Sequence, residues 1–277
     1  MHTKKQMCKD ILINNNIFIC PYCKKNLVLK NEILLCENNH NFDLTKKGNL
    51  FLLNTKNYKT STIYDMKLFK SRREFIENKF YDSVYKFIAK NINSFKLDNI
   101  KILDLGCGEG IHSKYIQEEI SYNNIIYGLD YSKDAISMAT DYLQNGNIYF
   151  VGDINNIPLT DNSIDVIIDF LSPYNTIEIN RVLKDEGYFI KIVPGDNYLK
   201  ELRKALMKDE YEKKEEVKQN ILKNIDIINE YEINEIKKIT NKDMYNLINM
   251  TPMYNKNDQI VINEITINVI IYIMQKR

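Results

Sequence analysis

The chain has 277 residues, of which 44% are hydrophobic and 27% charged, and its formal net charge is +1. This balance is typical of a folded protein and excludes a wholly disordered or fibrous chain. No apolar run reaches the ~20 residues that a membrane-spanning helix needs, and no apolar signal segment follows the first residues, so we expect neither a membrane nor a secreted protein. The five cysteines then favour a cytoplasmic location, where cysteine pairs bind metal more often than they form disulfides.

The charges are distributed unevenly along the chain. Residues 1–100 carry 18 Lys and Arg against 9 Asp and Glu, whereas the other residues carry 20 against 28. A basic N-terminal third joined to an acidic remainder indicates a polyanion-binding segment fused to a second function. A lysine-rich composition is the alternative explanation, but it would not account for the change of sign along the chain.

The first element in the chain is a short segment that carries cysteines. Cys20 and Cys23 flank a Pro-Tyr pair, and Cys36 follows after twelve residues, with His40 just beyond it. Three thiolates and one imidazole at this spacing predict a tetrahedral zinc site whose four positions are all filled by protein. The zinc ion would be structural, because the segment is too small to have a core of its own. Coincidental spacing and a redox Cys-x-x-C turn are the alternatives, and no thioredoxin-like pattern surrounds the turn.

The rest of the chain predicts a helical bridge followed by an α/β domain. Residues 57–93 contain no glycine or proline and have helical periodicity. From residue 100, short apolar runs alternate with amphipathic stretches, which predicts a parallel sheet covered by helices. The predicted strands are 102–105, 125–129, 148–151, 164–170 and 188–193; the predicted helices between them are 111–120, 133–144 and 176–183; the predicted tail has helices at 200–223 and 244–250 and a strand at 262–274. We therefore divide the chain into residues 1–55, 56–96 and 97–277.

The first strand of the α/β domain runs into a glycine-rich turn, Asp104-Leu-Gly-Cys-Gly-Glu-Gly110. Gly106 and Gly108 would let the backbone approach a ligand closely. The spacing is not that of a dinucleotide fingerprint, and Asp104 and Glu109 would repel a pyrophosphate. Two carboxylates at this bend instead favour a ligand that carries an amine.

Two further carboxylates follow the next two predicted strands. Asp130 ends the second strand, and Asp153 follows the third. Open α/β sheets bind ligands at the carboxyl ends of their strands, so Asp130 could hold both hydroxyls of a ribose and Asp153 could accept from an adenine amine. S-adenosylmethionine has the matching amino-acid, ribose and adenine parts, and we predict it as the cofactor. Each acid taken alone has an alternative role as a cap or turn residue.

Together these features resemble the RlmA family, whose members methylate N1 of a guanine in a hairpin of large-subunit (23S) ribosomal RNA. The resemblance rests on the cysteine–histidine set, Ser71-Arg-Arg-Glu-Phe75, the glycine loop and Met250-Thr-Pro252, in this order. It implies a Rossmann-like class I methyltransferase domain that uses S-adenosylmethionine, preceded by a small zinc-binding domain that recognises RNA. It is also compatible with a homodimer, although the composition does not require one.

The resemblance also implies roles for single residues. Tyr81, Gly108 and Glu109 match positions that contact the cofactor in the family, and Tyr198 stands where the family often has a cofactor-contacting histidine. Asp169, at the end of the fourth predicted strand, is our candidate to take the proton from guanine N1. The alternative for Asp169 is a solvent-facing charge at a strand end.

RNA contacts are expected from aromatic and basic side chains. A guanine splayed out of a loop could stack on Tyr174 or Tyr254, although packing alone would also explain both. Candidates for phosphate contacts, each of which could instead be ordinary surface, are Lys24, Lys25, Lys46, Lys47, Arg72 and Arg73.

Two other functions stay open at this point. One is a methyltransferase that acts on a small molecule or a protein, with a zinc site that serves only folding. The other is an RNA-binding protein without turnover. The basic N-terminal third argues against the first and the intact acids of the glycine loop against the second, whereas the fold cannot decide between them. We further expect that loss of zinc abolishes RNA methylation and leaves cofactor binding intact.

Overall fold

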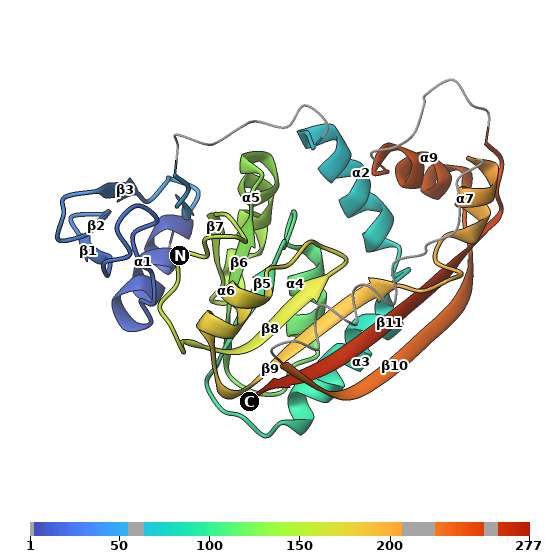
Figure 1. Ribbon diagram of the computed structural model, residues 1–277. Coiled ribbons are helices and arrows are strands. Elements are labelled where there is room, and N and C mark those ends of the chain that lie inside the picture. Colours follow the sequence, from blue (N-terminus) through green and yellow to red (C-terminus); the bar gives the residue numbers. More distant parts are fainter. Residues whose placement is uncertain (1–2, 55–63, 207–224, 252–259) are drawn as a thin grey trace.

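The computed structural model describes residues 3–54, 64–206, 225–251 and 260–277. Its centre is an eight-stranded sheet in the order β10-β11-β9-β8-β5-β6-β7-β4 (Figure 1). The strands are β4 (Asn49–Phe51), β5 (Ile100–Leu105), β6 (Asn124–Asp130), β7 (Ile148–Val151), β8 (Ile164–Phe170), β9 (Leu183–Pro194), β10 (Ile225–Lys238) and β11 (Glu264–Lys276). All neighbours from β4 to β9 are parallel, and β11 is antiparallel to both β9 and β10. The order reverses between β5 and β8, which is where such sheets bind ligands.

The five predicted strands of the α/β domain and its final strand are confirmed. The predicted bridge helix 57–93 is, over its described residues, two helices, α2 (Met66–Glu77) and α3 (Asp82–Ser94), because Lys79 between them has a left-handed backbone with φ 61°. Residues 57–63 lie outside the described residues. The predicted helix 133–144 changes to a 3-10 helix after α5 (Lys133–Ala139). Of the predicted helix 200–223, α7 (Lys200–Ala205) forms the start, and residues 207–224 lie outside the described residues.

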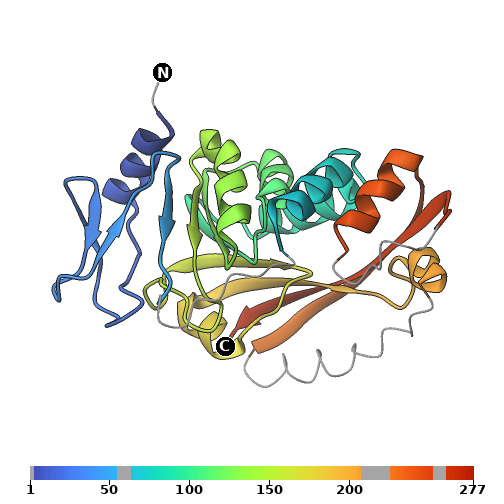
Figure 2. The ribbon, with the colours of Figure 1, turned by 90° about the horizontal axis from the view of Figure 1, so that it is seen from above.

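Both faces of the sheet are covered, and successive side chains of a strand contribute to the cores on opposite faces. On β5, Ile102 packs in the core beneath α2, α3 and α4 (Ile111–Glu118), whereas Leu103 packs in the core on the other face. Figure 2 shows α2 to α5 and α9 (Asn241–Asn249) along one side of the sheet. The other face is covered by α6 (Thr176–Val182) and by residues of the N-terminal part. None of the described helices is long and apolar enough to cross a membrane.

The N-terminal part begins with α1 (Lys4–Asn14) and a three-stranded antiparallel sheet, β1 (Val28–Lys30), β2 (Ile33–Leu35) and β3 (Asn41–Asp43). It packs directly on the large sheet. The Phe18 ring meets the Phe150 ring edge-on at 5.1 Å, and the Tyr127 hydroxyl donates to the Asn15 carbonyl oxygen at 2.7 Å. β4, which lies within the predicted N-terminal domain of residues 1–55, pairs with β7 as an edge strand of the large sheet. The N-terminal part therefore shares a core and a sheet with the α/β part.

Candidate metal cluster and cofactor site

The four predicted zinc ligands converge in the structure. The ligand atoms of Cys20, Cys23, Cys36 and His40, which we call the Cys3His cluster, all lie within 4.8 Å of one another. The Sγ atoms of Cys23 and Cys36 are 3.7 Å apart, and His40 Nδ1 is 3.4 Å from both Cys20 Sγ and Cys36 Sγ. Tetrahedral zinc, with bonds of about 2.3 Å to sulfur and 2.0–2.1 Å to nitrogen, places its ligands roughly 3.5–3.8 Å apart. The donor set and its spacing fit zinc.

Two turns present these ligands. In the first, the Lys24 backbone N–H donates to the Cys20 carbonyl, and in the second the Asn39 N–H donates to the Cys36 carbonyl. Lys24 and Asn39 both have φ of 61°. The left-handed residue tightens each turn, so that the ligands at its two ends face the same point.

The glycine loop at the end of β5 is shaped by close packing. Gly106 has φ 76°, and a Cβ atom there would lie 2.6 Å from the Ser172 side chain. Any larger residue would displace the turn that follows β8. The loop therefore depends on glycine at this position for its backbone conformation and for its contact with β8.

The two carboxylates of the glycine loop are both buried, but they have different surroundings. Asp104 accepts a hydrogen bond from the Ser113 hydroxyl of α4. Burial raises the pKa of Asp104 to about 7, and that of Glu109 also to about 7, against the opposing field of Arg72. Neither oxygen of Glu109 has a hydrogen-bond partner among the described residues. A buried carboxylate without a partner is costly unless a ligand pairs with it, and the ammonium group of S-adenosylmethionine would do so.

Asp130 and Asp153 lie at the same edge of the sheet, as predicted. Asp130 accepts from the backbone N–H of Gly108 at 3.0 Å and of Ser132 at 2.8 Å. It therefore braces the glycine loop. Burial raises the pKa of Asp130. Asp153 follows β7, which pairs with β6, and accepts from the Asn155 N–H at 2.8 Å.

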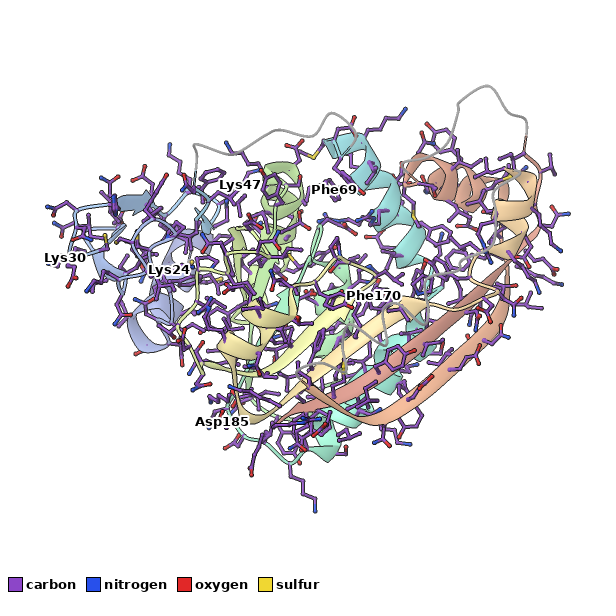
Figure 3. All side chains as sticks on the ribbon, viewed as in Figure 1. Lys24, Lys30, Lys47, Phe69, Phe170 and Asp185 are labelled. Atoms are coloured by element: carbon purple, nitrogen blue, oxygen red, sulfur yellow. The ribbon has the colours of Figure 1, made fainter. Side chains whose placement is uncertain are left out.

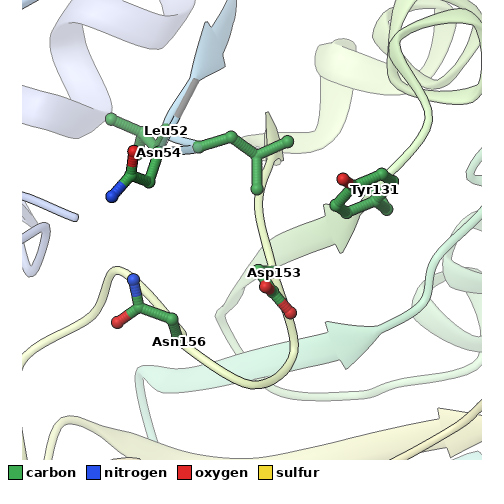
Figure 4. A pocket seen from close by; sticks show the side chains of 6 residues that line it. Leu52, Asn54, Tyr131, Asp153 and Asn156 are labelled. Carbon is green, nitrogen blue, oxygen red and sulfur yellow. The ribbon is translucent and has the colours of Figure 1, made fainter. Parts of the chain in front are cut away.

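A cavity of about 180 Å³ opens at this edge (Figure 4). Its lining residues are Leu52, Leu53, Asn54, Tyr131, Asp153 and Asn156. Only Asp153 among them was predicted. The place of Tyr131 directly after Asp130 was a usable signal, whereas Asn54 and Asn156 carry none in the sequence.

Tyr81 and Tyr198, both predicted to contact the cofactor, lie against each other in the structure. Tyr81 directly precedes α3, is 2% exposed, and has its hydroxyl 2.6 Å from that of Tyr198. Its ring packs edge-on against Phe170, at the end of β8, with ring centres 5.5 Å apart. The bridge is thereby joined to the region after β9, and the cofactor contacts expected of Tyr81 and Tyr198 stay predictions.

Asp169 is fully buried at the end of β8. Its carboxylate lies 2.8 Å from Lys191 Nζ and accepts from the Ser172 hydroxyl, also at 2.8 Å. Burial raises the pKa of Asp169 to about 6, against the opposing charge of Lys191. The alternative of a solvent-facing charge is wrong. Lys191 Nζ also lies 4.8 Å from the centre of the Tyr174 ring. The same lysine therefore contacts both Asp169 and Tyr174, the predicted stacking residue.

Several basic candidates for RNA contacts are engaged within the protein. Arg73 donates to Asp141 and to the backbone carbonyls of Glu109 and Met138, so it supports the glycine loop. The Arg72 guanidinium is 3.5 Å from the point where a Cβ of Gly108 would lie. Lys24 donates to Asn156, Lys25 pairs with Glu37, and Lys47 donates to Ser137. Figure 3 shows Lys24, Lys30 and Lys47 on the N-terminal part and its border with α5. Tyr254 lies outside the described residues.

Comparison with known proteins decides the family. The family described as "RlmA, N-terminal" matches residues 18–61, and the family described as "Methyltransferase domain" matches residues 96–251. YxjB of Bacillus subtilis (strain 168), which bears the name of a 23S rRNA (guanine-N(1)-)-methyltransferase, is 35% identical over 204 residues, or 71% of each chain. The chain belongs to the RlmA family of methyltransferases. The Streptomyces fradiae protein named 23S rRNA (guanine(748)-N(1))-methyltransferase is 25% identical over 189 residues, or 68% of this chain and 66% of that one.

Solved structures show the same fold. The complex of the Haloferax volcanii Trm112 methyltransferase activator with a methyltransferase matches with a TM-score of 0.53 and 14% identity, covering 79% of this chain and 99% of that one. The [4+2]-cyclase SpnF matches with a TM-score of 0.50 and 15% identity, covering 70% of this chain and 81% of that one. Because a cyclase shares the fold, the fold alone does not determine the reaction. The predicted methyltransferase fold with a small N-terminal zinc-binding domain and the predicted family are confirmed.

Proposed function

We propose that the chain is a cytoplasmic enzyme that transfers a methyl group from S-adenosylmethionine to N1 of a guanine in a hairpin of 23S ribosomal RNA. The observation that carries the proposal is that the N-terminal part, which holds the Cys3His cluster, packs on the same sheet whose edge presents Glu109, Asp130 and Asp153. The names of the relatives support the substrate, since two of them are named as 23S rRNA guanine-N1 methyltransferases.

The acids along the sheet edge fit the parts of this cofactor in order. When bound, the cofactor supplies a methyl group on a positively charged sulfur. Glu109 would hold its ammonium group, Asp130 its ribose hydroxyls and Asp153 its adenine amine. Tyr81 and Tyr198 would bound the site from the bridge side. Asp104, Gly106 and Gly108 would act by fixing the loop, since Asp104 is bonded to Ser113 and Gly108 to Asp130.

The protein must also orient the guanine and let its N1 proton leave. Methyl transfer requires the nucleophile in line with the methyl group, so holding the base is the main task. We propose that Tyr174 stacks on the guanine and that Asp169 accepts the proton. A pKa of about 6 suits a base that works near neutral pH. Asp169 Oδ2 has no hydrogen-bond partner among the described residues, and it is the oxygen that we assign to this step.

The N-terminal domain, residues 1–55, would bind the RNA. We propose that zinc is structural there, because four protein ligands fill a tetrahedral site and leave no position for a reacting water. Exposed lysines such as Lys30 and Lys46 would contact phosphates, which position a hairpin without reading its sequence. The homodimer and the division at residues 56 and 97 stay predictions.

The test is transfer of a labelled methyl group from S-adenosylmethionine to unmodified 23S ribosomal RNA, with the product nucleoside identified by mass spectrometry. We expect N1-methylguanosine. Absence of label in RNA, with the cofactor still bound, would contradict the RNA substrate and favour a protein or small molecule in its place. Absence of cofactor binding would contradict the proposal that the chain is a methyltransferase.

A further inference from the structure

One segment of the N-terminal part lines the 180 Å³ cavity, and a second is hydrogen-bonded to a residue of the cavity wall. The first is residues 52–54, which directly follow β4. Because β4 pairs in parallel with β7, and the Leu52 N–H donates to the Val151 carbonyl at 2.8 Å, both chains leave the sheet at the same edge. Leu53 and Asn54 are thereby placed at the cavity that Asp153 also lines.

The second segment is the turn that carries Cys20 and Cys23. Asn156 lines the cavity, and its amide nitrogen donates to the Pro21 carbonyl oxygen within this turn at 3.2 Å. Its amide oxygen accepts from the ammonium group of Lys24. The backbone N–H of Asn156 donates to the Asp153 carbonyl at 3.0 Å. One side chain therefore connects the wall of the cavity to the turn that presents two metal ligands.

The chemistry of the lining suits a nucleobase with an exocyclic amine. Leu52 and Leu53 offer an aliphatic surface, and Tyr131 offers an aromatic one (Figure 4). The Asp153 carboxylate can only accept hydrogen bonds, whereas the Asn54 amide can also donate. A cavity with aliphatic, aromatic and hydrogen-bonding side chains, among them a carboxylate and an amide, suits the amine and the ring nitrogens of adenine. Its volume is also far above the roughly 10–15 Å³ that admits a single water.

We propose that residues 52–54 form one wall of the adenine subsite, with Asn54 in contact with the base, and that Asn156 couples this subsite to the Cys3His cluster. The inference rests on the proposed cofactor. Asn156 is a positioning residue, because both ends of its amide are engaged by the turn. Coupling is reciprocal, so metal and cofactor each stabilise the binding of the other. This replaces the expectation that loss of zinc leaves cofactor binding intact.

The contact of Asn54 is tested by calorimetric titration of S-adenosylhomocysteine into the zinc-loaded full-length protein. We expect Asn54→Ala to raise Kd about tenfold, the effect of one lost hydrogen bond to a buried ligand. The matched control is Asn155→Ala, because Asn155 is an exposed neighbour that does not line the cavity. The control should bind within about twofold of the unchanged protein. Equal affinity of the Asn54 variant and the control would overturn the contact.

The coupling is tested by the rate at which a chromogenic chelator removes zinc from the folded protein, with and without saturating S-adenosylhomocysteine. We expect the ligand to slow zinc removal about tenfold in the unchanged protein and in Asn155→Ala, and less than about twofold in Asn156→Ala. If S-adenosylhomocysteine does not slow zinc removal from the protein without substitutions, the coupling is overturned. If the protein binds no S-adenosylhomocysteine at all, the proposed function fails; if it binds the ligand and methylates RNA but shows neither effect, only the inference fails.

Discussion

The hydroxyl oxygens of Tyr81 and Tyr198 lie 2.6 Å apart, although 117 positions separate the two residues in the sequence. Burial raises the pKa of Tyr81 well above the usual value for a phenol, so its hydroxyl keeps its proton at neutral pH, and either hydroxyl can donate to the other. This hydrogen bond joins the start of α3 to the segment after β9. The two tyrosines therefore act as one unit beside the glycine loop.

Tyr198→Phe should weaken this unit. The substitution leaves the buried Tyr81 hydroxyl without its partner, which costs about 1–3 kcal/mol in the free energy of unfolding. We expect that loss in denaturant titrations, with a severalfold weaker Kd for S-adenosylhomocysteine. Tyr198→His restores a donor and should recover most of the affinity. Stability and affinity both equal to those of the unchanged protein would show that the pair has no role.

Cofactor affinity should depend on pH through Glu109. Its pKa is raised to about 7 by burial, so the protonated form predominates in the cofactor-free protein below that pH. The ammonium group of the cofactor favours the carboxylate form and lowers this pKa, so binding releases a proton and affinity rises with pH. If the bound pKa is about 5, Kd should be about tenfold weaker at pH 6 than at pH 8.

The control for this prediction is Glu109→Gln, which has the same shape and does not titrate. It should bind more weakly and lose most of the dependence between pH 6 and 8. Asp104 has a similar pKa of about 7, but it is bonded to Ser113 and should titrate equally in the free and bound protein. If the Glu109→Gln variant kept the full pH dependence of Kd, another titrating group would be responsible for that dependence.

Removing the metal should destabilise the whole chain. Cys20 and Cys36 are buried in the same core as Leu129 and Phe150 of the large sheet. Cys36→Ser should therefore lower the single thermal transition by roughly 10 °C, since a structural zinc site contributes several kcal/mol or more. Circular dichroism in the far and near ultraviolet would follow both parts, and Cys8→Ala, a buried thiol of that core outside the cluster, is the control. Two separate transitions, with the larger one unchanged, would contradict the shared core.

The features that could be predicted from the sequence are those with a periodic pattern of apolar residues or a fixed spacing between functional residues. Asp130 and Asp153 were placed correctly because carboxyl ends of parallel strands share an edge, and the Cys3His cluster because its spacing is that of a known metal geometry. β4 was missed because three residues show no periodicity, and its pairing with β7 is set by packing of distant residues. β10 was missed because its exposed edge position lets it carry six acidic or basic residues among fourteen, which hides the strand pattern. Asn156 was missed because its role depends on a contact 135 positions away, with Pro21.

The role of Asp169 can be separated from that of its partners by the pH profile of single-turnover methyl transfer. If Asp169 accepts the guanine proton, the rate should rise through an apparent pKa near 6, the value that burial gives the carboxyl. Asp169→Asn alone would leave Lys191 buried and unpaired, which costs about 3–5 kcal/mol. The informative variant is therefore Asp169→Asn with Lys191→Gln, which removes both charges. We expect its rate to fall by about 10²–10⁴ and the rise in rate near pH 6, the acidic limb of the profile, to disappear. The Kd for S-adenosylhomocysteine should change little. Ser172→Ala, which removes a hydrogen bond to the acid and keeps its charge, should retain the limb. A limb near pH 6 that survives in the doubly substituted protein would mean that another group takes the proton, and that Asp169 serves only to hold Ser172 and Lys191 in place.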